Sequence, residues 1–275
     1  MLELPPVNVQ LLAQAIKAFL AEELRASGLA GYLVGLSGGV DSAVSAALAA
    51  TAVGPDRVSA LALPGPTSSP ESLRDATMVA DAFGLQLQVL DLTRPGDMLA
   101  ETLDARADRV RFGNLMARMR MVALFDRARP VPALVLGTSN KSEILLGYST
   151  LFGDAAASVQ PLGDVWKTHV FALARALGVP ESVITKAPTA DLWPGQTDAG
   201  ELGFEYATVD PVLYWHHEGG MGRDELVASG FPPPLVDGAL EAYRRNRFKW
   251  RPTVVARVSA SCINVDRILP RNPER

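Results

Sequence analysis

The spacing of apolar residues along the chain predicts strands that alternate with helices. Short apolar runs bounded by glycine, proline or polar residues predict strands at residues 32–36, 58–63, 85–92 and 133–137. Apolar residues at helical spacing predict helices over residues 9–25, 40–52, 70–83 and 168–177, and over most of residues 97–128, with a turn at Gly113 and Asn114. Because alternating strands and helices form a parallel sheet with both faces covered, we expect an α/β fold: a doubly wound, Rossmann-like parallel sheet flanked by helices.

The composition fits one large globular domain over residues 1–275. The net charge is −4, and the 20% of charged residues form no long run of one sign, so nucleic-acid binding is not expected. No apolar run reaches the roughly 18 residues of a membrane span. Residues 1–10 lack the positive segment and apolar core of a signal peptide. The single cysteine, Cys262, excludes an intrachain disulfide, which fits a reducing, cytoplasmic location. Because no apolar span is present, no membrane partner is expected.

A glycine-rich turn with a carboxylate follows the first predicted strand. The stretch GLSGGVDS at residues 35–42 joins that strand to an alanine-rich helix. The free N–H groups at a helix N-terminus bind anions, and paired glycines let backbone approach a ligand closely. Because Asp41 would repel phosphate unless a divalent cation lay between them, the loop predicts a phosphate site that also holds Mg²⁺. The Walker and dinucleotide-binding patterns are absent, and the loop resembles the SGGxDS loop of the N-type ATP pyrophosphatases.

A second informative stretch, GTSNKSEILLGYSTLFGD, occupies residues 137–154 and follows the fourth predicted strand. Ser142 and Glu143 predict the start of a helix. Glu143 could have no role beyond a favourable interaction with the helix dipole. Beside a loop that holds Asp41, however, it is a natural second Mg²⁺ ligand. Ligands of doubly wound sheets bind beyond the carboxyl ends of the strands, so both stretches are expected to meet over one nucleotide.

The last third of the chain changes in composition. Residues 186–204 are rich in Pro, Gly, Thr and Asp and predict a long, lid-like loop. Short helices are expected after Thr208. A basic segment then opens a C-terminal tail at residues 244–275, and the family resemblance described next implies that this tail closes over the substrate.

Several motifs together carry a resemblance to the ammonia-dependent NAD⁺ synthetases over nearly the whole chain. Besides the two stretches above, the matching segments are ALPGPTSSPES at 62–72, GNLMARMR at 113–120, PLGDVWKT at 161–168, KAPTADLWPGQTDAGELGF at 186–204 and RFKWRP at 247–252. Their number and order make the likeness far more specific than the phosphate loop alone.

The resemblance implies a role for individual residues. Residues of the phosphate loop would wrap ATP, namely Gly35, Leu36, Ser37, Gly38, Gly39, Val40, Asp41 and Ser42. Thr138, Lys167 and Thr189 would also contact ATP, with Asp41 and Glu143 as the Mg²⁺ ligands. Arg118 would hold deamido-NAD⁺, and Lys249 would close over the site. From the residues alone, Arg118 and Arg120 fit a solvated basic helix face equally well.

Three positions depart from the better-known bacterial pattern. Leu151 replaces a lysine, Ser158 an aspartate and Phe248 a histidine, and all three are substrate-side contacts in the family. We therefore expect altered contacts to the dinucleotide, with the ATP and metal positions intact.

The resemblance implies a two-step reaction. The carboxylate of deamido-NAD⁺ attacks the α-phosphorus of ATP and releases pyrophosphate, and ammonia then displaces AMP to give NAD⁺. The chain is too short for a glutaminase domain, so free ammonia or a separate partner protein would supply the nitrogen. The family also implies a homodimer. Two alternatives remain open: another adenylating ATP pyrophosphatase, acting on XMP or tRNA, and a non-catalytic nucleotide-binding regulator.

Overall fold

The computed structural model has a parallel sheet of four strands in the order β3-β2-β1-β4. The structure describes residues 2–193, 195–250, 253–259 and 261. The strands are β1 (Gly31–Gly35), β2 (Val58–Ala62), β3 (Gln86–Val89) and β4 (Ala133–Leu136). Tyr32 pairs with Val58 on one side and with Leu134 on the other, and a bridge from Leu136 to Val159 extends the β4 edge. The α/β class predicted from the sequence is confirmed.

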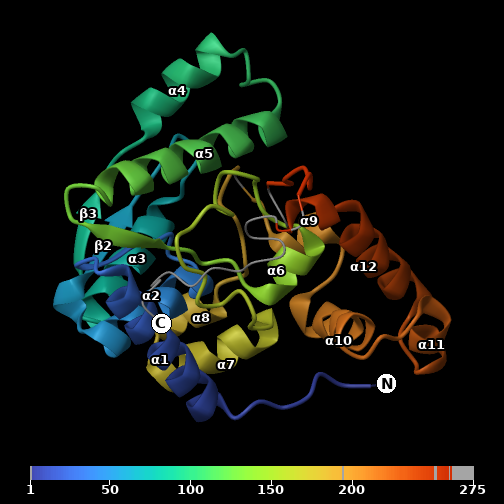
Figure 1. The fold of residues 1–275 in the computed structure, drawn as a ribbon. Coiled ribbons are helices and arrows are strands. Elements are labelled where there is room, and N and C mark those ends of the chain that lie inside the picture. The colour runs from blue at the N-terminus through green and yellow to red at the C-terminus, as the bar shows by residue number, and fades with distance from the viewer. Residues whose placement is uncertain (1, 194, 251–252, 260, 262–275) are drawn as a thin grey trace.

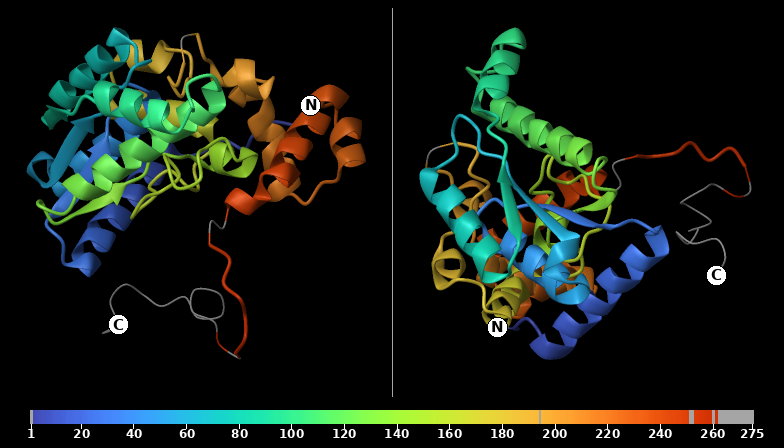
Figure 2. Two further views of the ribbon diagram at one scale, coloured as in Figure 1. Left: turned by 90° about the horizontal axis from the view of Figure 1, so that it is seen from above. Right: turned by 90° about the vertical axis from the view of Figure 1, so that its left-hand side faces the viewer.

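Helices cover both faces of the sheet (Figures 1 and 2). The helices of the first 185 residues are α1 (Val9–Ser27), α2 (Val40–Val53), α3 (Pro70–Ala82), α4 (Thr93–Thr102), α5 (Arg109–Arg127), α6 (Lys141–Leu146), α7 (Lys167–Leu177) and α8 (Glu181–Thr185). The later ones are α9 (Asp198–Leu202), α10 (Tyr206–His217), α11 (Arg223–Ala228) and α12 (Pro233–Arg245), and short 3₁₀ turns lie at Pro55–Arg57 and Arg247–Lys249.

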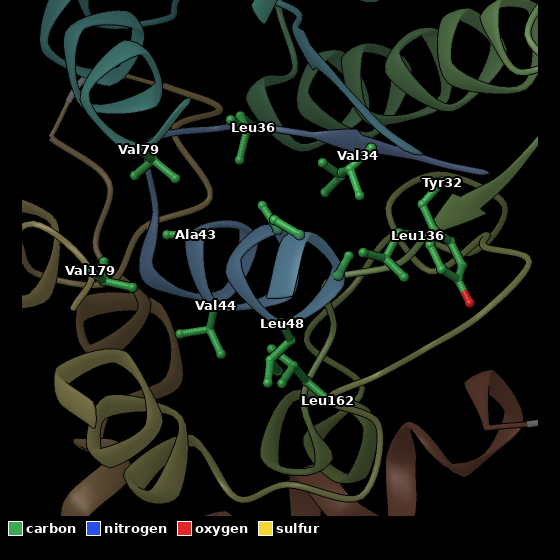
Figure 3. Packing of buried hydrophobic residues seen from close by; sticks show 14 of the residues in the cluster. Tyr32, Val34, Leu36, Ala43, Val44, Leu48, Val79, Leu136, Leu162 and Val179 are labelled. Carbon is green, nitrogen blue, oxygen red and sulfur yellow. The ribbon is translucent and has the colours of Figure 1, made fainter. Parts of the chain in front are cut away.

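Successive side chains along a strand point to opposite faces of the sheet and pack into two separate cores. Tyr32 and Val34 of β1 pack with α1, α2, α3 and α7, whereas Leu33 between them packs with α4 and α5 on the other face. Helix α2 is apolar on almost every side because it lies between the sheet and the outer helices α1 and α7 (Figure 3). Consequently the phosphate loop, which joins β1 to α2, is fixed at both ends by buried elements.

A third apolar cluster joins α6 to the helices of the last third of the chain. Val209 and Leu213 of α10 pack with Leu226 of α11 and Leu240 of α12, and Leu145 of α6 belongs to the same cluster. This helical layer therefore packs directly against the element that carries Glu143. Within the part of the chain that the structure describes, no helix is long and apolar enough to cross a membrane.

The sequence prediction was wrong for the turn in residues 97–128. The chain breaks at residues 103–108, between α4 and α5, and Gly113 and Asn114 lie inside α5. Gly113 serves packing instead, because a Cβ there would lie 3.0 Å from Leu192 Cδ1. The third strand is also shorter than expected, and the loop at residues 186–204 ends in the short helix α9.

Candidate active site

A cavity of about 500 Å³ opens where the carboxyl ends of β1, β2 and β4 meet. Its wall contains the phosphate loop, the segment after β2, the start of α6 and part of the loop before α9. The predicted ATP and metal residues that line it are Gly35, Leu36, Ser37, Gly39, Val40, Asp41, Ser42, Thr138, Glu143, Lys167 and Thr189. Segments far apart in the sequence thus form one site, at the sheet edge where ligands of doubly wound folds bind.

The phosphate loop is held open by its own serines. Ser37 N and Ser37 Oγ both lie within hydrogen-bond distance of Ser42 Oγ, at 3.3 and 3.1 Å, and Gly39 N donates to Ser37 Oγ at 3.2 Å. Helix α2 begins at Val40, and its N-cap Gly39 offers no side-chain cap, so the first N–H groups are available to an anion. Gly38 does not line the cavity. Its φ of +80° and the 2.3 Å from an added Cβ to Ser72 O make glycine necessary there.

A buried lysine joins the two predicted metal ligands. Lys167 is 2% exposed, and its Nζ lies 2.5 Å from Asp41 Oδ2 and 2.9 Å from Glu143 Oε1. Asn140 orders both carboxylates, because its Nδ2 donates to Asp41 Oδ1 at 2.8 Å and its backbone N donates to Glu143 Oε2 at 3.3 Å. Asn140 is the N-cap of α6 and completes a capping box with Glu143.

The charges in this cluster depend strongly on one another. Burial raises the pKa of Glu143 to about 8, although Lys167 opposes the shift. Burial alone would lower the pKa of Lys167, but Asp41 and Glu143 outweigh it and hold the pKa above its ordinary value. The lysine is therefore a permanent cation at this end of the cavity.

The donor set fits a hard divalent cation that is shared with a ligand. Asp41 and Glu143 present carboxylate oxygens to the same cavity, and Mg²⁺ is commonly held by one or two carboxylates together with substrate phosphates and water. No group of three or more His, Cys, Asp or Glu side chains is arranged to hold a metal among the residues described.

Of the five residues predicted to bind the substrate, the structure places one in the lining of the cavity and four outside it. Lys249 lines the cavity, and its Nζ donates to Gly147 O at 2.6 Å and Ser149 O at 2.7 Å. Arg118, Leu151, Ser158 and Phe248 lie outside the cavity lining of the single chain.

Each of these four has a different setting. Arg118 is exposed and its Nε donates to Leu151 O at 3.3 Å. The Ser158 hydroxyl accepts from Val135 N at 3.2 Å and closes the edge of β4. Phe248 is 62% exposed. Contact of these side chains with substrate stays a prediction.

Sequence reasoning missed several polar side chains that line the cavity. Arg120, two residues after Arg118, is half-buried, and it donates to Leu63 O at 3.2 Å and to Ser68 Oγ at 3.1 Å. Asp154 accepts from Thr150 N at 2.9 Å, and burial raises its pKa. The regular spacing of arginines on α5 could have indicated that Arg118 and Arg120 point in different directions.

The described residues 186–193 of the predicted lid loop are attached to α3 and to the segment before it. Asp191, at φ +50°, accepts from Ser69 N at 3.2 Å and from Ser72 Oγ at 3.0 Å. Thr67 Oγ1 donates to Leu192 O at 3.0 Å, and Lys186 Nζ lies 2.9 Å from Asp75 Oδ2. The loop therefore lies against the rim of the cavity. The tail is described only at residues 244–250, 253–259 and 261, so Cys262 lies outside the described residues.

The fold and the site define a nucleotide-binding α/β protein whose phosphate loop lies beside a lysine and two carboxylates. The model of the family described as NAD synthase matches residues 12–253. The chain is 44% identical over 248 residues to the NH(3)-dependent NAD(+) synthetase of Chlorobaculum parvum, covering 90% of this chain and 89% of that protein. The chain therefore belongs to the NAD synthase family.

Two solved structures show the same fold. The NMN synthetase of Francisella tularensis is 28% identical, covers 92% of this chain and is itself covered fully, with a TM-score of 0.81. The NH3-dependent NAD synthetase of Campylobacter jejuni is 29% identical, covers 91% of this chain and is also covered fully, with a TM-score of 0.77.

Proposed function

We propose that the chain amidates deamido-NAD⁺ to NAD⁺ with ammonia and ATP, and that the cavity beyond β1, β2 and β4 is the site of the reaction. The reaction makes the chain a carbon–nitrogen ligase. Membership of the NAD synthase family supports the assignment, as does the 44% identity to a relative of nearly equal length. The observation that supports this site is that the phosphate loop, with Asp41, lies in one cavity with Glu143 and Lys167.

The first step needs alignment and charge neutralisation more than covalent chemistry. The N–H groups at the start of α2 and the serine hydroxyls of the loop would bind phosphate oxygens of ATP. Lys167 would neutralise charge that develops as pyrophosphate leaves. Mg²⁺, which Asp41 and Glu143 would hold together with phosphate oxygens, would supply further neutralisation.

The second step needs the acyl-adenylate to be protected from water until ammonia arrives. The loop that Asp191 attaches to Ser69 and Ser72 supports such protection, because it lies along the cavity rim. We also propose a cytoplasmic location, which the single cysteine in the sequence supports.

Pyrophosphate release from Mg-ATP tests the function directly. The acceptor should be varied between deamido-NAD⁺ and nicotinate mononucleotide, because one close structural neighbour is an NMN synthetase. We expect release that requires deamido-NAD⁺, and NAD⁺ that forms only with ammonium. Faster turnover of nicotinate mononucleotide than of deamido-NAD⁺ would mean that the chain is an NMN synthetase instead. Pyrophosphate release with XMP or tRNA would support another adenylating enzyme, and ATP binding without release under any acceptor would support a regulator.

Releasing the lid loop should weaken ATP binding without unfolding the protein. Asp191→Gly removes the two hydrogen bonds to Ser69 and Ser72, while glycine relieves the left-handed backbone at φ +50°. Each of the two lost hydrogen bonds is worth about 1 kcal/mol, so the open loop should become roughly thirtyfold more populated. We expect a several-fold higher KM for ATP, an unchanged melting temperature and faster tryptic cleavage after Lys186. Unchanged cleavage would contradict the proposed lid.

We propose that the chain forms a homodimer. The outer face of α5 exposes Val122 and Phe125, and Val122 is 61% exposed. A second copy would cover these apolar side chains. Light scattering should give twice the 29.3 kDa mass of the chain, and Val122→Asp should shift the protein toward that single mass. A monomeric wild-type protein at micromolar concentration would contradict the proposal.

A further inference from the structure

Asp210 is a buried carboxylate that does not line the cavity. It lies on α10 with 0% exposure. Its Oδ1 accepts from Ser142 Oγ at 2.6 Å, and its Oδ2 accepts from Thr168 N at 2.9 Å and from Thr168 Oγ1 at 2.7 Å. A buried carboxylate is costly to desolvate, so it persists where its hydrogen bonds are satisfied and its position matters. These three bonds join α10 to α6 and α7, which lie side by side in Figure 1.

Asp210 acts as the N-terminal cap of α7 from another helix. The residue at the N-cap position, Trp166, offers no side-chain acceptor. Instead, Thr168 N donates to Asp210, and Lys167 N donates at 2.9 Å to Ser142 Oγ, which itself donates to Asp210. The carboxylate therefore satisfies two of the free N–H groups of α7, one of them through Ser142, and its negative charge complements the helix dipole.

The same hydrogen bonds fix the backbone on both sides of the charged cluster. Lys167 is the first residue of α7, and Ser142 directly precedes Glu143 in α6. Because the Lys167 side chain must reach both Asp41 and Glu143, a shift of either backbone would move its Nζ away from them.

We propose that Asp210 is a positioning residue that sets Lys167 and Glu143 for ATP through Ser142 and Thr168. The inference rests on the proposed function only in assigning Lys167 to ATP. A purely structural role would join the α10–α12 layer to the rest of the molecule and would affect stability alone. The two roles predict different results for ATP binding by a fully folded variant. A positioning role predicts weaker binding, and a purely structural role predicts unchanged binding.

Asp210→Asn is the decisive variant, because it keeps the shape but places an amide nitrogen against a hydrogen-bond donor. Calorimetric binding of an unreactive Mg-ATP analogue, together with KM and kcat for pyrophosphate release, should be measured well below the melting temperature. We expect the affinity for the analogue to fall about tenfold and kcat to fall between ten- and a hundredfold, as for a displaced catalytic group. Tyr32→Phe (Figure 3) is the control, because it removes another buried hydrogen bond, to Leu20 O at 2.7 Å, at a side chain that does not line the cavity.

Ser142→Ala keeps the bonds of Asp210 to Thr168 but removes the acceptor of Lys167 N. It should produce part of the same loss, and the double variant with Asp210→Asn should be little worse than Asp210→Asn alone. The proposal is overturned if Asp210→Asn lowers the melting temperature as Tyr32→Phe does but keeps analogue affinity and kcat within twofold of wild type. If Asp210→Asn fails to fold, wild-type affinity in Ser142→Ala overturns it equally. Binding of the ATP analogue needs no acceptor, so a failure of the synthetase assignment leaves this measurement interpretable.

Discussion

Lys167→Met should reduce pyrophosphate release by about a thousandfold, the upper range for removing one group that stabilises transition-state charge. Methionine is nearly the length of lysine but leaves Asp41 and Glu143 facing each other without a cation. Removing one partner of a buried ion pair typically costs about 3–5 kcal/mol, so the melting temperature should fall as well. Initial rates with deamido-NAD⁺ and ammonium, measured below the melting temperature of the variant, separate the two effects.

Lys141→Met is the matched control for this experiment. Lys141 also lies between two carboxylates, at 2.7 Å from Asp164 and 2.5 Å from Glu218, but it does not line the cavity. We expect this variant to keep the wild-type rate within about twofold, because its partners Asp164 and Glu218 are 92% and 37% exposed and solvent screens these ion pairs. If Lys167→Met keeps more than a tenth of the wild-type rate, Lys167 does not act on the phosphates.

Much of the fold follows from local sequence patterns. The alternation at Tyr32, Leu33 and Val34 directs side chains to opposite faces of a sheet, and this is how β1 is covered in the structure. The alanine-rich run at residues 40–52 predicts a helix, and its apolar character explains why the structure buries α2 on almost every side. These patterns depend on neighbouring residues only, so the strand and helix positions were predicted without any knowledge of the long-range contacts.

The interactions within the site could not be derived in this way. Asp41 and Lys167 are 126 residues apart in sequence, and nothing local indicates that their side chains meet. Asn140 fits the pattern of a helix cap, which explains its bond to Glu143 but not its bond to Asp41. The contacts of Asp191 with Ser69 and Ser72 are of the same kind, since they join segments more than a hundred residues apart.

The arginines of α5 show where residue type alone is insufficient. Arg118 and Arg120 have the same chemistry and lie two positions apart, so they point to different sides of one helix. The structure directs Arg120 toward the cavity and leaves Arg118 exposed beside Leu151. A substrate role for Arg118 therefore requires a ligand that extends beyond the cavity of one chain, or a second copy that completes the site.

Asp41→Asn should abolish metal-dependent pyrophosphate release, with a loss of at least a hundredfold. The substitution keeps the shape of the side chain, and the amide oxygen can still accept the hydrogen bond that Asn140 Nδ2 donates at 2.8 Å. The substitution removes the negative charge of Asp41, which would hold the cation against the phosphates. The same charge pairs with Lys167 Nζ at 2.5 Å. The phosphate loop itself is fixed by Ser37, Ser42 and the buried helix α2, so the fold should survive.

Binding of Mn²⁺ in place of Mg²⁺, followed by electron paramagnetic resonance with an unreactive ATP analogue, reports the metal without depending on turnover. Wild-type protein should bind the ion much more tightly with the analogue than without it, because two carboxylates alone form an incomplete site. Asp41→Asn should lose most of this enhancement. Asp164→Asn, which removes an exposed carboxylate paired with Lys141, should keep it. Equal Mn²⁺ affinity in Asp41→Asn and wild type would mean that Asp41 serves Lys167 alone, and the cation would then have to be held by Glu143 and the phosphates.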